Sequence, residues 1–141
     1  MILLDTNVLS ELIRPTPNAV VLDWFTRQTD AELFTSAITE AEMLLGVRLL
    51  PAGKRRKELE GLVQAMFAED LAGRVLPFDS VAALHYAQIA ADRRSAGRPI
   101  SQFDAQIAGI ARAYGAVLAT RNTADFDGCG VILVNPWMTT V

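Results

Sequence analysis

The chain has 141 residues, of which 51% are hydrophobic and 21% are charged, and its formal net charge is −3. These values are typical of a globular protein, and the length favours a single domain over residues 1–141. The negative charge argues against a protein that coats nucleic acid by bulk electrostatics, but it is compatible with a nuclease that meets phosphate through a metal ion.

Short apolar segments alternate with helical patterns along the whole chain. Each strand is predicted from a short apolar run and each helix from apolar periodicity or a capping residue. In chain order, we predict strand 2–4, helices 8–13 and 18–25, strand 33–35, helices 39–49 and 59–67, strand 74–76, helices 79–94 and 101–115, and strands 116–119 and 131–134. This alternation is typical of an α/β fold with a central parallel sheet and helices on both faces.

Two helices have apolar stripes that we expect to face the core. Their members are Leu59, Leu62, Val63, Met66 and Phe67 in one helix, and Phe103, Ile107, Ile110, Ala111 and Tyr114 in the other. The first stripe, or the apolar face of helix 18–25, could instead serve dimerisation. Trp137 is expected to pack as an anchor near the end of the chain.

Acidic and polar side chains follow the carboxyl ends of the predicted strands. Asp5 comes directly after the first strand. Glu42 and Asp104 each lie at the third position of a predicted helix that begins at the same edge. Asn122 and Asp125 follow the strand at 116–119. In an open parallel sheet, ligands bind beyond this edge, so we expect these segments to bring acidic groups to one rim.

Helix capping is the alternative explanation for each acid taken singly. Three acids lie three residues after a polar residue that can cap a helix, at Thr39-x-x-Glu42, Ser101-x-x-Asp104 and Asn122-x-x-Asp125. In a capping box, the acid accepts the backbone N–H of the cap residue. Asp5 has no capping role as clear as these, although a cap or turn through residues 5–7 stays open. Capping explains each position but not the shared location.

Carboxylates gathered within a few ångströms repel one another, and a hard divalent cation relieves that repulsion. Mg²⁺ binds few protein oxygens and keeps several waters, so a few carboxylates are enough. Such an ion can activate a water and neutralise charge on phosphoryl oxygens. The hydroxyl of Thr6 or Thr120 could orient a metal-bound water or a phosphate oxygen. We therefore expect metal-assisted chemistry on a phosphate ester.

Several basic residues are candidates for contacts to phosphate. The run 54–57 is expected to be a solvated face. Arg93, Arg94 and Arg98 could form a phosphate-steering rim, although surface positions explain them as easily. Arg121 is the better candidate, because it follows a strand at the acidic edge.

The single cysteine, the single histidine and the absence of long apolar runs exclude several classes of protein. The lone Cys129 excludes an internal disulfide and fits a reducing cytoplasm. The lone His85 excludes zinc sites built from several histidines and makes a serine-type triad improbable. No apolar run is long enough for a membrane span, and the N-terminal segment lacks the basic region of a signal peptide. We predict a cytoplasmic protein without a membrane segment.

At these residues the sequence resembles the PIN-domain ribonucleases, and among them the toxins of the VapC and FitB kind from bacterial toxin–antitoxin pairs. The order and spacing of the matching segments make the resemblance specific. These segments are residues 1–11, 36–42 with Gly46, 75–79, 103–108, 119–126 and 135–137.

The resemblance implies a PIN-like fold and a Mg²⁺-dependent endoribonuclease, with Mn²⁺ able to substitute. It also implies a homodimer and a hetero-oligomer with a partner antitoxin whose tail occupies the acidic groove. The first three acids of the family fall on Asp5, Glu42 and Asp104. The fourth position is open between Asp125 and the neutral Asn122. Supporting positions in this assignment are Thr6, Asn7, Thr120, Arg121 and Asn122.

Two other functions are compatible with parts of the sequence. Asp5 could be the nucleophile of a phosphatase, but phosphatases of the haloacid dehalogenase type carry a second Asp where this chain has Asn7. The neutral Asn122 suggests instead a catalytically weakened PIN-like domain that is kept for binding proteins. Metal binding separates the nuclease from this interaction module.

Overall fold

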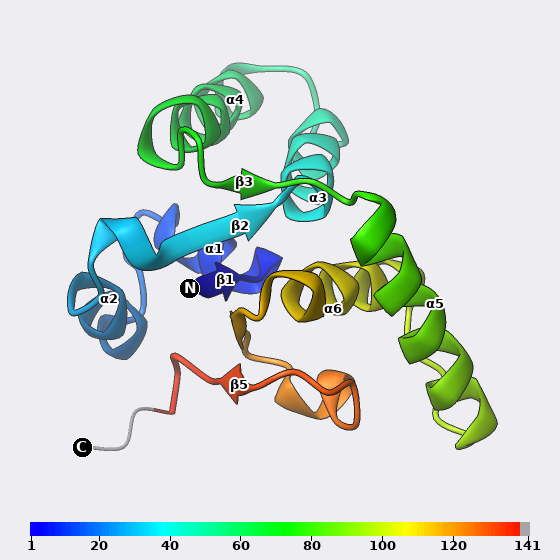
Figure 1. Cartoon of the computed structure of the whole chain (residues 1–141). Helices are drawn as coiled ribbons and strands as arrows, with labels where there is room; N and C mark the ends of the chain where they lie inside the picture. The colour runs from blue at the N-terminus through cyan, green and yellow to red at the C-terminus, as the bar shows by residue number, and fades with distance from the viewer. Residues whose placement is uncertain (139–141) are drawn as a thin grey trace.

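The computed structural model describes residues 1–138, and its centre is a five-stranded parallel sheet in the order β3-β2-β1-β4-β5 (Figure 1). The strands are β1 Ile2–Leu4, β2 Leu33–Ser36, β3 Val75–Leu76, β4 Val117–Ala119 and β5 Leu133–Val134. The chain moves from β1 outward to β3, then returns to the other side of β1 for β4 and β5. The strand order therefore reverses between β1 and β4, where ligands bind in open parallel sheets.

Six α-helices connect and cover the strands (Figure 1). They are α1 Thr6–Leu12, α2 Ala19–Thr26, α3 Ala37–Arg48, α4 Lys54–Ala65, α5 Ser80–Ser95 and α6 Gln102–Tyr114. Shorter turns are the 3₁₀ turns Asp30–Glu32 and Thr123–Phe126, and a π turn at Met66–Asp70 that continues α4. The predicted elements are thus present, and most of their ends differ by one or two residues. In the described part of the chain, no helix has the length and apolarity needed to cross a membrane.

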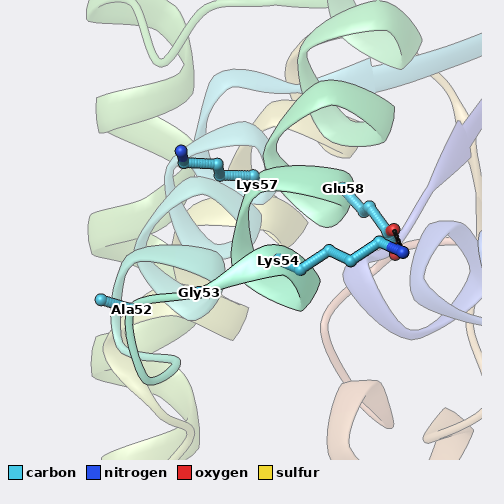
Figure 2. Close-up of a pocket in the computed structure, with 5 residues that line it drawn as sticks. All are labelled: Ala52, Gly53, Lys54, Lys57 and Glu58. Carbon is cyan, nitrogen blue, oxygen red and sulfur yellow. Dashed lines mark ion pairs between the residues drawn. The ribbon is translucent and has the colours of Figure 1, made fainter.

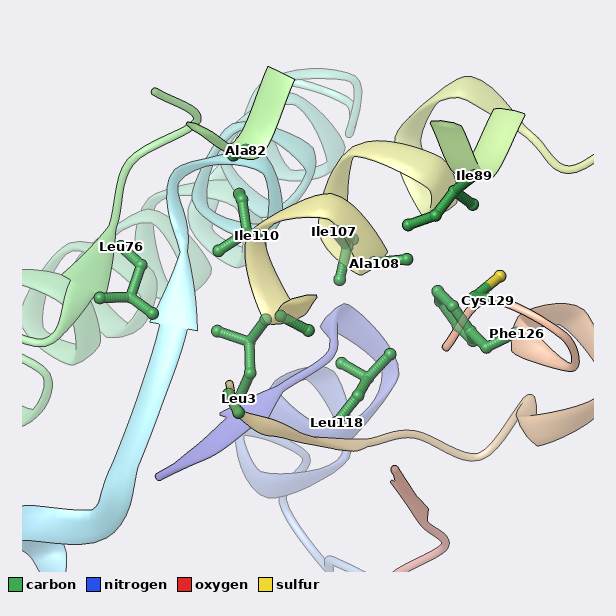
Figure 3. Packing of buried hydrophobic residues seen from close by; sticks show 12 residues of the cluster. Leu3, Leu76, Ala82, Ile89, Ile107, Ala108, Ile110, Leu118, Phe126 and Cys129 are labelled. Atoms are coloured by element: carbon green, nitrogen blue, oxygen red, sulfur yellow. The ribbon is translucent and has the colours of Figure 1, made fainter. Parts of the chain in front are cut away.

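The two faces of the sheet are covered by two separate apolar clusters, which confirms the predicted α/β fold with helices on both sides. Successive strand residues point to opposite faces, so Leu3 and Leu118 join one cluster while Leu4 and Ala119 join the other. On the first face, Leu3 and Leu118 pack beneath α6 (Figure 3). The second face is covered by side chains of α1 to α4 and the π turn.

Helix α6 lies very close to α5 because a glycine faces that helix. A Cβ atom at Gly109 would lie 2.8 Å from the carbonyl oxygen of Ala82, closer than real Cβ contacts allow. The buried face of α6 also carries Ala105, Ala108 and Ala111. This close packing fixes α6, whose N-terminus carries Asp104, against the rest of the domain.

Three residues of the predicted apolar stripes are exposed. Phe103 is 51% exposed, Tyr114 37% and Leu62 50%. Phe103 and Tyr114 lie near the two ends of α6, in its first turn and at its last position, and neither belongs to the apolar cluster beneath the helix. The prediction that they belong to the core is therefore wrong, whereas Ile107, Ile110 and Ala111 are buried as expected.

Candidate active site

Asp5 lies at the end of β1 and is only 5% exposed. Its backbone N–H continues the sheet by donating to the carbonyl of Ala119 at 3.0 Å. One carboxylate oxygen, Oδ1, accepts the N–H of Thr6 at 2.8 Å, so Asp5 caps α1. Oδ2 accepts the hydroxyl of Thr120 at 2.7 Å. Helix α1 consequently begins two residues earlier than predicted, and Asp5 has the capping role that the sequence left open.

Thr120 and Asn7 join the two segments that meet where the strand order reverses. The fully buried Thr120 hydroxyl oxygen accepts the Asn7 side-chain amide at 3.3 Å and the Asn122 backbone N–H at 3.1 Å. The Asn7 side chain also lies 3.4 Å from Asp5 Oδ2, and its carbonyl accepts the backbone N–H of Arg121 at 3.2 Å. The network holds the Asp5 carboxylate in one orientation.

Glu42 is held from the side of α1. Its Oε1 accepts the Thr6 hydroxyl at 3.0 Å, and the same hydroxyl lies 3.2 Å from that of the buried Thr39. The predicted capping box is wrong, because α3 begins at Ala37 and its cap is Ser36, whose hydroxyl accepts the backbone N–H of Thr39 at 3.0 Å. Glu42 is the sixth residue of α3, beyond the turn where an acid caps a helix. Helix capping therefore does not explain this carboxylate.

Asp104 lies in the first turn of α6, as the sequence predicted. Ser101 caps the helix, and its hydroxyl accepts the Asp104 backbone N–H at 3.2 Å. The Asp104 side chain is half-buried.

The pKa values show that these carboxylates act on one another. The pKa of Asp5 is raised to about 6, mainly by burial and further by the charges of Asp104 and Glu42, and the hydrogen bonds from Thr120 and Thr6 offset part of this rise. Burial and the charge of Asp104 raise the pKa of Glu42. Three acids from β1, α3 and α6 thus share one electrostatic environment at the predicted edge of the sheet.

Asp125 lies in the 3₁₀ turn Thr123–Phe126, and its negative charge adds to burial in raising the pKa of Asp104. Its backbone N–H donates to the carbonyl of Asn122 at 3.0 Å, but the Asn122 side chain forms no capping hydrogen bond. The third predicted capping box is therefore wrong. Of the two candidates for the fourth corner, Asp125 is the one whose charge acts on another of the acids, Asp104.

The basic residues occupy places of different kinds. Arg121 is exposed and stacks over the ring of Trp137 at 5.1 Å, at the edge that carries the acids. In the run 54–57, Lys54 pairs with Glu58 at 3.7 Å beside a shallow hollow that none of the four acids lines, in agreement with a solvated face (Figure 2). Arg93 contradicts its prediction as a rim or surface residue, because it is 8% exposed and its guanidinium points inward.

Glu11 is a polar residue that the sequence analysis missed. It is 6% exposed, accepts the backbone N–H of Asn18 at 3.0 Å and pairs with Arg14 at 3.1 Å. The bond from Asn18 is the main reason why the pKa of Glu11 is lowered. Glu11 therefore fixes the connection between α1 and α2.

The donor set fits a hard cation that keeps part of its water shell. Within residues 1–138, no three acidic, histidine or cysteine side chains are close enough together to enclose an ion directly. The acids nevertheless offer the oxygen ligands that Mg²⁺ prefers, and a carboxylate has about four lone-pair sites, so Asp5 keeps some free beside its protein donors. Raised pKa values also show that repulsion among the acids is not neutralised by a basic side chain. An ion bound through few carboxylates and several waters matches this arrangement.

The chain matches the PIN-domain family over residues 2–128. It is 43% identical to VapC ribonuclease Y4jK of Sinorhizobium fredii over 137 residues, which cover 97% of this chain and 98% of that protein. It is 42% identical to toxin FitB of Neisseria gonorrhoeae, with 97% and 99% covered. A chain in the structure of FitAB bound to an IR36 DNA fragment superposes with a TM-score of 0.93 at 41% identity, with 100% and 99% covered. This chain therefore belongs to the PIN-domain family, among proteins of the VapC and FitB kind.

Proposed function

We propose that this protein is a Mg²⁺-dependent endoribonuclease and the toxin of a type II toxin–antitoxin pair. The observation that carries the proposal is the buried Asp5, which has a pKa of about 6 and shares its environment with Glu42 and Asp104 where the strand order reverses. The similarity of the chain to a VapC ribonuclease and to toxin FitB along nearly its whole length supports the nuclease over other uses of an acidic cluster.

In this proposal Asp5, Glu42 and Asp104 hold Mg²⁺, with Asp125 as the fourth acid. Mn²⁺ would substitute, since it has similar ligand preferences. When bound, the ion supplies a water of lowered pKa and positive charge beside the phosphoryl oxygens.

The chain's own residues orient the ligands. Thr120 and Asn7 hold the Asp5 carboxylate, and Thr6 holds that of Glu42. Arg121, exposed at the same edge, would contact an RNA phosphate.

Partners follow from the relatives and from the surface. The FitAB structure is of a complex bound to DNA, and by analogy we infer a cognate antitoxin that forms a hetero-oligomer with this chain, itself a homodimer. An apolar groove of about 550 Å³ lies between α1, α2 and α4, and the exposed Leu22 and Leu62 line it. A surface of this kind supports a protein contact there. The cytoplasm remains our proposed location.

The test is RNA cleavage by the purified chain with Mg²⁺, with and without a chelator. We expect cleavage that requires the ion and is abolished in Asp5→Asn and Asp104→Asn, both of which keep the fold. The matched control is Asp23→Asn, which removes an exposed carboxylate of α2 and should leave the activity unchanged. Cleavage that survives in Asp5→Asn would overturn the nuclease assignment.

Two measurements separate the proposal from the other two functions: metal titration tests for an interaction module, and phosphate transfer tests for a phosphatase. An interaction module predicts no Mg²⁺ affinity that depends on Asp104. A phosphatase with Asp5 as nucleophile predicts phosphate transfer to that carboxylate. The Asn7 side chain donates toward Asp5 at 3.4 Å, so it offers no second carboxyl for such a reaction.

A further inference from the structure

Arg93 is a buried charged residue that the proposed chemistry does not use. It lies near the end of α5 and is 8% exposed. Within residues 1–138 it forms no ion pair, and its donors go to three backbone carbonyls and, at 3.5 Å, to the sulfur of Cys129. Nε donates to the carbonyl of Arg98 at 2.7 Å, and Nη1 donates to those of Asp125 at 2.8 Å and Asp127 at 2.9 Å.

Through these acceptors, Arg93 connects α5 to the loop that carries Asp125. A single nitrogen, Nη1, binds two carbonyls of one loop, so it fixes where residues 125 and 127 lie relative to α5. The planar guanidinium presents its donors in a rigid fork, which a lysine ammonium on a flexible stem does not reproduce. One of the two carbonyls belongs to Asp125, whose carboxylate charge acts on Asp104.

The same loop has separate apolar anchors. Phe126 is 1% exposed and Cys129 is 2% exposed, and both belong to the cluster beneath α6. Phe126 has no hydrogen bond to the Arg93 side chain, so its burial contributes to holding the loop independently of Arg93. The hydrogen bonds of Arg93 add orientation to a loop whose attachment is already secured by packing.

We propose that Arg93 is a positioning residue for the metal site, and that it acts by holding the 125–129 loop so that the Asp125 carboxylate reaches the other acids. The inference rests on the proposed function, because it requires that Asp125 contributes to metal binding. It adds a residue outside the acidic set, on a different helix from any of the acids.

The experiment is a double-mutant cycle on Mn²⁺ affinity, followed by the spectroscopic signal of free Mn²⁺ with the full chain. The variants are wild type, Arg93→Lys, Asp125→Asn and the double variant, and the thermal midpoint of each is recorded so that all are compared when folded. Removing a partner that orients a metal ligand typically weakens affinity about 10-fold or more. We expect about 10-fold weaker binding in each single variant and no further loss in the double variant.

The control is Arg98→Met, which removes the exposed ion pair between Arg98 and Asp127 at 3.1 Å. It perturbs the same loop and should leave Mn²⁺ affinity within twofold of wild type, since an exposed pair contributes little. If Arg93 had only a structural role, Arg93→Lys would lower the thermal midpoint. The losses of Mn²⁺ affinity in Arg93→Lys and Asp125→Asn would then multiply in the double variant.

Several outcomes would overturn the inference. Wild-type affinity in Arg93→Lys, or multiplied losses in the double variant, would show that Arg93 does not act through Asp125. Arg93→Gln is the second variant if Arg93→Lys fails to fold, and failure of both would show that Arg93 supports the fold rather than the site. Unchanged Mn²⁺ affinity in Asp5→Asn would instead contradict the proposed function itself, so the two failures are distinguishable.

Discussion

Replacing Asp5 by Asn should make the metal-free protein more stable at pH 7, although it removes the central acid of the site. The pKa of Asp5 stands at about 6, against 3.8 for an aspartate in water, and burial is the main cause. One pKa unit corresponds to 1.36 kcal/mol, so the ionised carboxylate destabilises the folded state by about 3 kcal/mol at pH 7. An amide at this position avoids that penalty.

Part of the gain is lost because the amide donates where the carboxylate only accepts. Oδ1 of Asp5 accepts the Thr6 N–H and Oδ2 accepts the Thr120 hydroxyl, but an amide has only one oxygen, so one of these two bonds must be given up. A lost hydrogen bond costs about 1 kcal/mol. The net gain is therefore about 2 kcal/mol, or about 8 °C in thermal midpoint for a domain of this size.

The sign of the pH dependence follows from the raised pKa. The folded protein binds the Asp5 proton more tightly than the unfolded chain does, so this group lowers stability as pH rises from about 4 to about 6. Below about pH 4 the carboxyl is protonated in both states and the penalty is absent. The advantage of Asp5→Asn should therefore appear between about pH 4 and pH 6 and stay constant above.

The assay is thermal and urea unfolding of both proteins in chelator at several pH values, with Asp23→Asn as the exposed control. A variant that is less stable than wild type at pH 7, or a difference that does not change with pH, would refute the reasoning. Saturating Mg²⁺ at about 100 times its dissociation constant should add about 2.7 kcal/mol to the wild type and much less to Asp5→Asn. With Mg²⁺ bound, the free energy of unfolding of the wild type should then equal or exceed that of Asp5→Asn.

Four further predictions concern the stability of the domain. Thr120→Val removes the buried hydroxyl that donates to Asp5 and should destabilise the protein by about 1–3 kcal/mol at pH 7, with a smaller loss near pH 4 in the same unfolding assay. Glu11→Gln should lower the thermal midpoint at pH 7, because the lowered pKa of Glu11 means that its charge stabilises the fold; the difference should shrink as pH falls below about 4.5. Gly109→Ala brings a Cβ to 2.8 Å from a carbonyl of α5 and should cost about 1–3 kcal/mol in urea unfolding. Gly61→Ala, which meets nothing within 4 Å, should gain about 0.5–1 kcal/mol in the same measurement.

Local sequence signals predicted the helices and strands and the edge of the sheet where the acids gather. They could do so because strand ends and helix caps depend on a few consecutive residues. Asp104 is the clear case, because Ser101 follows a turn and caps α6 as expected. Glu42 shows the limit of such signals. Ser36 and Thr39 are both good caps, and the choice between them depends on β2 extending to Ser36, where it pairs with Leu76 of β3. That pairing joins residues far apart in the sequence, so the sequence near Ser36 does not reveal it.

Side chains whose partners lie far along the chain could not be placed from sequence. Arg93 binds carbonyls 32 and 34 residues later, and no local pattern distinguishes it from the exposed Arg94 beside it. The prediction that the whole apolar stripe of α6 is buried was wrong for a different reason. The prediction placed large apolar residues inside, but the close approach of α5 leaves room only for a small residue at Gly109, and Phe103, in the first turn of α6, is exposed.

Asp5 caps a helix, and yet capping does not account for its properties. A carboxylate whose role is to cap a helix gains from the N-terminal N–H groups, and its pKa is lowered as a result. At Asp5 that contribution and the hydroxyl of Thr120 are both present, but burial and the neighbouring acids outweigh them and the pKa rises to about 6. A neutral Asn would cap the helix as well without the penalty. A charge that the fold holds against its own stability therefore points to a ligand that needs that charge, which is what a cation at this edge would be.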